Sequence, residues 1–183
     1  ITMGDPASIG PEITLKLFSD PQRFDRCRPV VIGDASVLEA AKAYTGLVHL
    51  RIHPIREVKD AYYQRDTIDV IDMQQVDLTR LKIGEISEMA GNAAFVYVKK
   101  VIELAMDGQV DATVTNALSK EAINLAGHHF AGHTEIYAHY TGTKNYTMML
   151  AYNDMRVVHV STHVSLREAC DRVKKDRIME VIQ

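Results

Sequence analysis

Hydrophobic positions along the chain alternate between short β-branched runs and longer stretches with helical spacing. The short runs fall at residues 28–33, 48–53, 67–72, 111–116, 146–152 and 156–162. Helical patterns lie between most of them, and the clearest spans about residues 88–106, where Ala93, Tyr97 and Leu104 share one face. Strands joined through helices need crossover connections, so the pattern predicts an α/β protein with a largely parallel sheet. Ligands in such folds gather at the carboxyl ends of the strands.

Local signals mark where several helices begin or end. Pro11 suits a first helical turn, because its missing N–H would be unpaired there anyway. Gly46 predicts a helix C-terminus. Ser165 and Glu168 have the spacing of a capping box, which predicts a helix N-terminus.

The length of 183 residues allows one domain and the beginning of another. A strand pattern ends and polar loop residues collect near residues 116–127, so we expect a first α/β domain at 1–120 and the truncated start of a second at 121–183. The chain begins inside a strand pattern without an initiator Met and stops inside a helical pattern. We therefore expect a part of a longer protein.

Composition is typical of a soluble globular protein, with 46% hydrophobic and 25% charged residues. The 21 basic residues are interspersed among 24 acidic ones, which argues against nucleic-acid binding. The apolar stretches are well short of the roughly 20 residues that a membrane helix needs, so no membrane association is expected. Two distant cysteines, Cys27 and Cys170, form no disulfide framework and indicate a reducing, cytoplasmic location.

Two polar loops follow predicted strands and are candidate ligand sites. Residues 4–12, GDPASIGPE, form a Gly/Pro-rich turn before a helix, but they do not match G-x-G-x-x-G, and such turns are more often structural. Residues 115–122, TNALSKEA, place Lys120 at the ligand edge of the sheet. The alternative, which the residue types alone favour, is that Ser119 caps a helix and Lys120 is solvated.

Four of the eight histidines lie in residues 127–139, GHHFAGHTEIYAH. His129 and His133 have the spacing of a metal-binding pair on a helix. Gly127 precedes them and Gly132 lies between them, however, and each glycine costs a helix interior about 1 kcal/mol. We therefore predict a loop that turns into a helix near Thr134, with structural or interface roles for His128, His129 and His139.

His159 and His163 are also four residues apart, in the run VVHVSTHV. Its β-branched composition predicts a strand, whose rise of about 3.3 Å per residue would separate the two side chains by roughly 13 Å. They cannot share one metal ion at that distance. His159 is predicted to be buried in mid-strand, whereas His163 is predicted at the carboxyl end, where sites form.

Four motifs in order resemble a single family: GDPASIGPEI, VTNALSKEAINLAG, GHTEIYA, and MMLA followed by RVVHVSTHVSLREA. Together they are similar to the 4-hydroxythreonine-4-phosphate dehydrogenases, the NAD-dependent enzymes of pyridoxal phosphate synthesis. The resemblance covers the amino-terminal part of that family's chain. Ser8 and TNALSK stand where the vitamin-pathway branch has glycine and T-G-P-x-x-K, so the chain looks more like the branch that oxidises D-threonate or D-erythronate 4-phosphate.

The resemblance implies an isocitrate/isopropylmalate dehydrogenase-like two-domain α/β fold, here incomplete. It also implies a homodimer with active sites at the subunit interface. It assigns substrate binding to His133 and Thr134, and the first divalent-metal ligand to His163. Lys120 becomes the candidate for charge stabilisation or proton transfer. The candidates beside the cofactor are Gly4, Asp5, Gly10 and Glu12.

The implied reaction is an NAD-dependent oxidation with decarboxylation of 4-phosphohydroxy-L-threonine or a related four-carbon hydroxy-acid 4-phosphate. NADP is the alternative cofactor, and one Zn, Co, Mg or Mn ion would assist. A phosphate acyltransferase-like enzyme of similar fold, which needs no histidine metal site, is the more distant alternative. A third possibility is an inactive fragment that only binds phosphate ligands.

Overall fold

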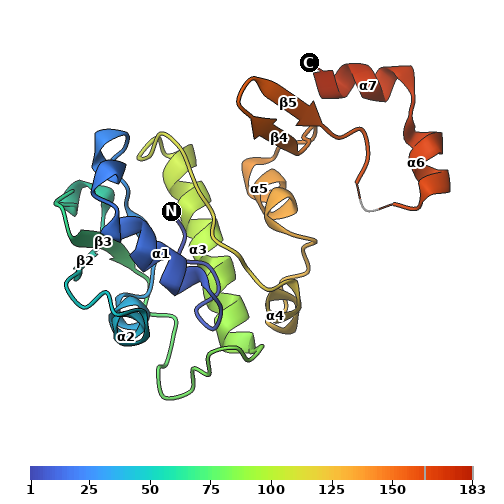
Figure 1. The fold of residues 1–183 in the computed structure, drawn as a ribbon. Helices are drawn as coiled ribbons and strands as arrows, with labels where there is room; N and C mark the ends of the chain where they lie inside the picture. Colours follow the sequence, from blue (N-terminus) through green and yellow to red (C-terminus); the bar gives the residue numbers. More distant parts are fainter. Residues whose placement is uncertain (163, 183) are drawn as a thin grey trace. The chain divides into compact units, whose positions relative to one another are not determined.

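A computed structural model describes residues 1–162 and 164–182 (Figure 1). The chain divides into two compact units, Ile1–Ile136 and Tyr137–Gln183, which are described separately below. The expected boundary after residue 120 falls inside the first unit. As a division of the whole protein into domains, that boundary stays a prediction.

Three parallel strands form the centre of the first unit. They are β1 (Val31–Gly33), β2 (Arg51–Ile55) and β3 (Thr67–Asp72), in the order β1-β3-β2. Thr2 bridges both Ile32 and Thr115 in parallel, so the segments around residues 2 and 115 extend the sheet beyond β1. The α/β class with a parallel sheet is therefore confirmed for this unit.

Four α-helices belong wholly to the first unit: α1 (Gly10–Ser19), α2 (Ala35–Thr45), α3 (Glu88–Met106) and α4 (Lys120–Leu125). Two 3-10 turns, η1 (Pro21–Asp25) and η2 (Val58–Asp60), accompany them. Helix α1 packs on α2, and α3 packs on β1 and on α4 (Figure 1). The helix predicted at 88–106, the first-turn Pro11 and the left-handed stop at Gly46 (φ 72°) are all confirmed.

The core lies between the sheet and these helices. Helix α3 contributes most of its apolar face, because Ala93, Tyr97 and Leu104 recur at helical spacing and are all buried. Glycine at 91 lets α4 approach closely, since a Cβ there would lie 2.0 Å from the Ala122 carbonyl oxygen. The large side chains that are completely buried in this unit include Phe18, Leu15, Leu38, Leu50, Ile68, Ile102 and Ile123.

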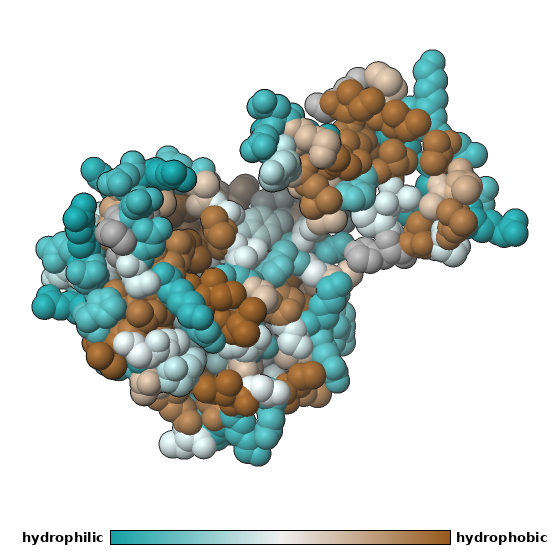
Figure 2. Space-filling model, in the orientation of Figure 1, coloured by the Kyte–Doolittle hydropathy of each residue, from teal (hydrophilic) through white to brown (hydrophobic). Residues whose placement is uncertain are grey.

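The second unit holds a β-hairpin and two short helices. Helix α5 (His133–Thr141) begins in the first unit and ends in the second. Strands β4 (Met149–Tyr152) and β5 (Met155–Val158) follow, and then α6 (Leu166–Arg172) and α7 (Lys175–Ile182). Every residue of β4 is exposed, and Figure 2 shows apolar side chains gathered over the hairpin.

One feature of this region was not predicted, and one expectation was wrong. Strands β4 and β5 pair antiparallel, because the two-residue connection between them is too short for the crossover that parallel strands need. His159 does not lie in mid-strand: the pairing ends at Val158, and His159 follows it half-buried, with Nδ1 3.2 Å from the Met148 carbonyl oxygen. The cap predicted at Ser165 is confirmed, since its Oγ accepts from Glu168 N at 3.3 Å.

Of the helices in the described ranges, none combines the length and the apolar character that a membrane span requires.

Candidate functional site

The turn at Gly4 and Asp5 lies directly against residues 116–119, at the carboxyl edge of the sheet. Asp5 N donates to the Ala117 carbonyl oxygen at 3.0 Å. Gly4 has a φ of 79°, and a Cβ on it would lie 2.6 Å from the same oxygen. The two polar loops that follow predicted strands are therefore brought together, as expected for the ligand edge of a parallel sheet.

Asn116 links this turn to helix α1. Its Nδ2 donates to Thr14 Oγ1 at 2.9 Å and, more weakly, to the Gly10 carbonyl oxygen at 3.4 Å. A Cβ on Gly10 would lie 2.1 Å from the Met3 carbonyl oxygen, so the chain can cross here only at glycine. Close packing alone accounts for Gly4 and Gly10, and their contact with a cofactor stays a prediction.

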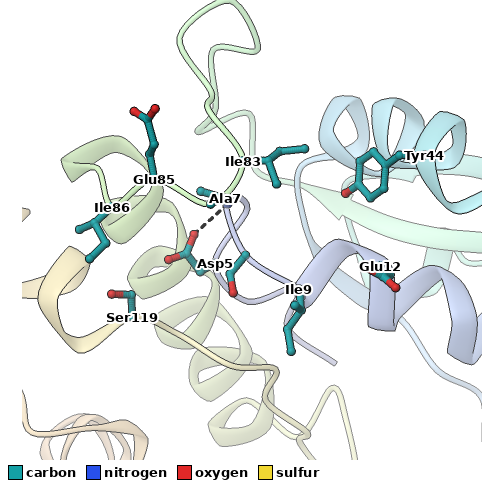
Figure 3. A pocket seen from close by; sticks show the side chains of 11 residues that line it. Asp5, Ala7, Ile9, Glu12, Tyr44, Ile83, Glu85, Ile86 and Ser119 are labelled. Carbon is teal, nitrogen blue, oxygen red and sulfur yellow. Dashed lines mark hydrogen bonds between the residues drawn. The ribbon is translucent and has the colours of Figure 1, made fainter.

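The carboxylate of Asp5 is almost completely buried and is held from two sides. Its Oδ1 accepts from Ala7 N at 2.8 Å, the contact drawn as a dashed line in Figure 3. Burial raises the pKa of this carboxyl, and hydrogen bonds from the backbones of Ala7 and Ser119 oppose that rise. Asp5 is thus a fixed acceptor in the lining of an open space.

That open space is a cleft of about 320 Å³ within the first unit (Figure 3). Its lining is partly apolar, from Ile9, Ile83 and Ile86. The other lining residues are Asp5, Glu12, Tyr44, Glu85 and Ser119, which bring polar groups, and Ala7, Ser8 and Gly84. This volume lies at the lower end of the range for small-molecule pockets. Burial and the nearby Glu12 both raise the pKa of Tyr44, so its phenol stays a neutral donor.

His133 is the first residue of α5 and lies against the backbone of Asn116. Burial lowers the pKa of its imidazole, and the contact with Asn116 partly offsets this. Among the described residues, its Nε2 is a fully buried side-chain atom without a hydrogen-bond partner. Such an unpaired buried atom is uncommon in folded proteins and calls for a partner.

Lys120 and Thr134 are both exposed, at the starts of α4 and α5. Ser119 caps α4 by accepting from Ala122 N at 3.2 Å, so the structural interpretation of Ser119 and Lys120 is correct as far as it goes. The Lys120 side chain also lies close to Gly132, since a Cβ built on Gly132 would be 3.7 Å from Lys120 Cε. The structure thus brings Lys120 beside the GHTE turn.

The other histidines of the GHHFAGHTE loop have structural partners. His128 Nε2 lies 3.0 Å from Asn92 Oδ1, and its ring stacks on Phe95 at 3.7 Å. His129 Nδ1 lies 3.2 Å from Asn124 Oδ1. Since α5 begins only at His133, the loop prediction is confirmed and the two imidazoles do not share a helical face.

A complete metal site is not found in residues 1–162 and 164–182, where no group of three or more His, Cys, Asp or Glu side chains could hold an ion. His163, the predicted metal ligand, lies outside the described residues. The metal site therefore stays a prediction.

Two residues of this edge were missed by the sequence analysis. Asp34 is buried directly after β1, and Tyr97 of α3 donates to its Oδ1 at 2.8 Å. The signal for Asp34 was an acidic residue immediately after a buried strand, where a structural or ligand role is usual. Tyr97 had been assigned only to the apolar face of its helix.

Comparison with known proteins gives the class and then the family. The model of the protein family described as "Pyridoxal phosphate biosynthetic protein PdxA" matches residues 25–183, and the chain belongs to this family. A relative from Symbiobacterium thermophilum, named provisionally as a D-threonate 4-phosphate dehydrogenase, is 42% identical over all of this chain. One with the same name from Clostridium botulinum is 40% identical. The chain spans 54% of the length of each.

Solved structures agree with this assignment. A 4-hydroxythreonine-4-phosphate dehydrogenase from Burkholderia phymatum matches 99% of the chain with a TM-score of 0.91 and 39% identity. One from Klebsiella pneumoniae matches with the same TM-score and 38% identity. The chain covers 54% and 55% of those two chains, respectively.

Proposed function

We propose that the protein is an NAD-dependent dehydrogenase that oxidises a phosphorylated four-carbon hydroxy acid. The family match and the names of the relatives support a dehydrogenase of this class. 4-Phosphohydroxy-L-threonine and D-threonate or D-erythronate 4-phosphate fit this support equally well. NAD is the proposed hydride acceptor, with NADP as the alternative.

The observation that carries the proposal is the unpaired Nε2 of His133. A neutral imidazole in this position can hydrogen-bond a substrate hydroxyl or phosphate oxygen. Lys120 lies beside the same turn, where its cation can pair with the substrate's anionic groups, and it is the proposed group for charge stabilisation or proton transfer. Thr134 follows His133 and, being exposed, can donate its hydroxyl to the same ligand.

The cleft beside Asp5 and Glu12 is the proposed place for one half of the dinucleotide. Its apolar isoleucines suit an aromatic ring, and its carboxylates can accept from ribose hydroxyls. The substrate hydroxyl would lose its proton to the protein, and the carbon that bears this hydroxyl would lose a hydride to the nicotinamide. His163 is the proposed ligand of a divalent ion, which when bound would lower the hydroxyl pKa and stabilise charge during decarboxylation.

A homodimer with active sites at the subunit interface is also proposed. Its support is the exposed apolar surface of the hairpin, where Met149, Leu150 and Tyr152 are each more than half exposed. A monomer rarely leaves so many neighbouring apolar side chains in water. The balanced charge and the absence of a disulfide framework from the two cysteines of the sequence favour a cytoplasmic location.

The test uses the full-length protein, NAD and the three phosphorylated hydroxy acids, with NADH absorbance and carbon dioxide release as readouts. We expect activity that a chelator stops. His133→Gln should lower kcat/KM at least about 100-fold, since it leaves a substrate oxygen poorly paired. His139→Gln, on the exposed side of the same helix, is the matched control and should leave kcat/KM within about twofold.

His163→Ala is expected to abolish metal-dependent activity and to reduce the bound metal measured by mass spectrometry. Unchanged turnover with full metal content would refute that assignment. NADH formation from none of the substrates, together with acyl transfer to phosphate, would instead support the acyltransferase-like alternative.

A further inference from the structure

The wall of the cleft is a segment without regular secondary structure, residues 73–87 between β3 and α3. It contributes Ile83, Gly84, Glu85 and Ile86 to the cleft lining (Figure 3). Irregular backbone lacks the repeated hydrogen bonds of a helix or sheet, so its position depends on individual contacts. Its start is bonded to the end of β1, where Met73 N donates to the Gly33 carbonyl oxygen at 2.9 Å, and two further contacts bear on the cleft.

The first contact fixes the cleft end of the segment. Gly84 N donates to the Ala7 carbonyl oxygen at 2.7 Å, so the wall is joined to the turn that carries Asp5. The second holds residues 75 and 76, shortly after the segment begins. Val76 N donates to Asp34 Oδ2 at only 2.6 Å, and the backbone of Gln75 also bonds to this carboxylate.

Asp34 is itself held from the core. It is 0% exposed, and its Oδ1 accepts from the Tyr97 hydroxyl at 2.8 Å. Burial of this carboxyl raises its pKa, and the nearby Asp72 adds to the rise, while the bonds from Tyr97 and Val76 oppose it. A buried carboxylate lowers the stability of the fold unless several donors hold it, so its presence here points to a specific role.

We infer that Asp34 is a positioning residue that fixes segment 73–87 and thereby the wall of the cleft. It acts through the backbone of Gln75 and Val76 and does not line the cleft itself. The expected effect on ligand binding rests on the proposed function, because it takes the cleft as part of the dinucleotide site.

The first unit provides a matched control in Asp69. This residue of β3 is also almost fully buried, at 1% exposed, and its carboxylate likewise holds a loop. It accepts from Tyr62 N at 3.1 Å, from Tyr63 N at 2.9 Å and from His53 at 2.7 Å. None of these partners lines the cleft. A general loss of core stability would therefore affect Asp34 and Asp69 variants alike.

The experiment compares Asp34→Ala and Asp69→Ala in the full-length protein by hydrogen exchange and by NAD titration. Asp34→Ala should speed exchange of the amides in 74–87 at least about tenfold, and raise the KM for NAD by a similar factor with kcat little changed. Asp69→Ala should speed exchange near Tyr62 and Tyr63 and leave the KM for NAD within about twofold.

The milder Asp34→Asn, which keeps the shape but loses the charge, gives the same directions if the alanine variant does not fold. Wild-type protection of 74–87 in a folded Asp34 variant, or equal opening of this segment in Asp69→Ala, would overturn the inference. An opened segment with an unchanged KM for NAD would overturn its link to the cleft. If the wild-type protein binds no NAD, the cofactor proposal fails, while the exchange comparison still decides the role of Asp34.

Discussion

The first compact unit surrounds β1, β3 and β2 with helices and buries side chains such as Leu38 and Ile68 completely. In residues 137–162 and 164–182, by contrast, no residue is buried. An isolated hairpin is at most marginally stable in water, whereas a sheet covered by helices supports itself. The first unit therefore has a buried core of its own, whereas the described residues around the hairpin have none.

The largest expected effect separates the two units by core truncation. Leu38→Ala should lower the free energy of unfolding by about 3 kcal/mol, because it leaves a cavity at a site that is 0% exposed. Leu166→Ala, at a side chain that is 83% exposed, should change it by less than about 0.5 kcal/mol. Urea titration of both variants measures the contrast, and equal losses would contradict it.

The next effect concerns association through the hairpin. Leu150→Asp in the full-length protein should weaken a homodimer at least about tenfold, since a charge would replace an apolar contact. Leu125→Asp is the control, because this leucine of α4 is similarly exposed but belongs to the first unit. Sedimentation equilibrium gives the dissociation constants; a dimer unaffected by Leu150→Asp would show that the hairpin is covered in another way.

Two helix caps of the same geometry give a smaller contrast. Ser87 caps α3 in the first unit by accepting from Ala90 N at 3.2 Å, and Ser165 caps α6 in the second by accepting from Glu168 N at 3.3 Å. Ser87→Ala should lower the unfolding free energy by about 1 kcal/mol. Ser165→Ala should leave the main transition within about 0.5 kcal/mol, because α6 adds little to it. Thermal and urea unfolding measure both variants, and an equal loss of unfolding free energy in Ser87→Ala and Ser165→Ala would contradict this contrast.

The smallest effect is a pH dependence from His133. Burial holds its folded-state pKa below the ordinary value of 6.5, so above that pH both states carry a neutral imidazole. As the pH falls below 6.5, the unfolded chain takes up the proton first, and the free energy of unfolding decreases. His133→Asn should remove this part of the pH dependence, whereas Thr134→Ala, its exposed neighbour, should retain it. Urea titrations at pH 7.5 and 5.5 measure the loss of unfolding free energy in each variant, and an unchanged loss in His133→Asn would contradict the prediction.

The class of fold and several element ends were open to prediction from sequence. The runs at 67–72 and 88–106 carry strong periodic signals, and the structure has β3 and α3 at those bounds. The antiparallel pairing of β4 with β5 was missed, because the connection at 153–154 was not recognised as a tight turn. His159 was misplaced because the predicted strand continued to residue 162, whereas the pairing ends at Val158.

For the candidate site, the sequence singled out the two loops and His133 with Thr134, through local motifs and a family resemblance. It could not show that Nε2 of His133 is buried without a partner, or that Lys120 reaches Gly132. Those facts depend on which segments meet, and His133 and Asn116 meet only after the chain has turned between them.

Residues close together in the chain were enough to predict the alternation of strands and helices, the helix ends at Pro11 and Gly46, and the family. The folded chain was needed to show that the turn at Gly4 crosses residues 116–119 and that Asp34 joins β1, α3 and segment 73–87. Contacts between distant segments depend on packing geometry, and a buried carboxylate shows its purpose only when its donors are in place.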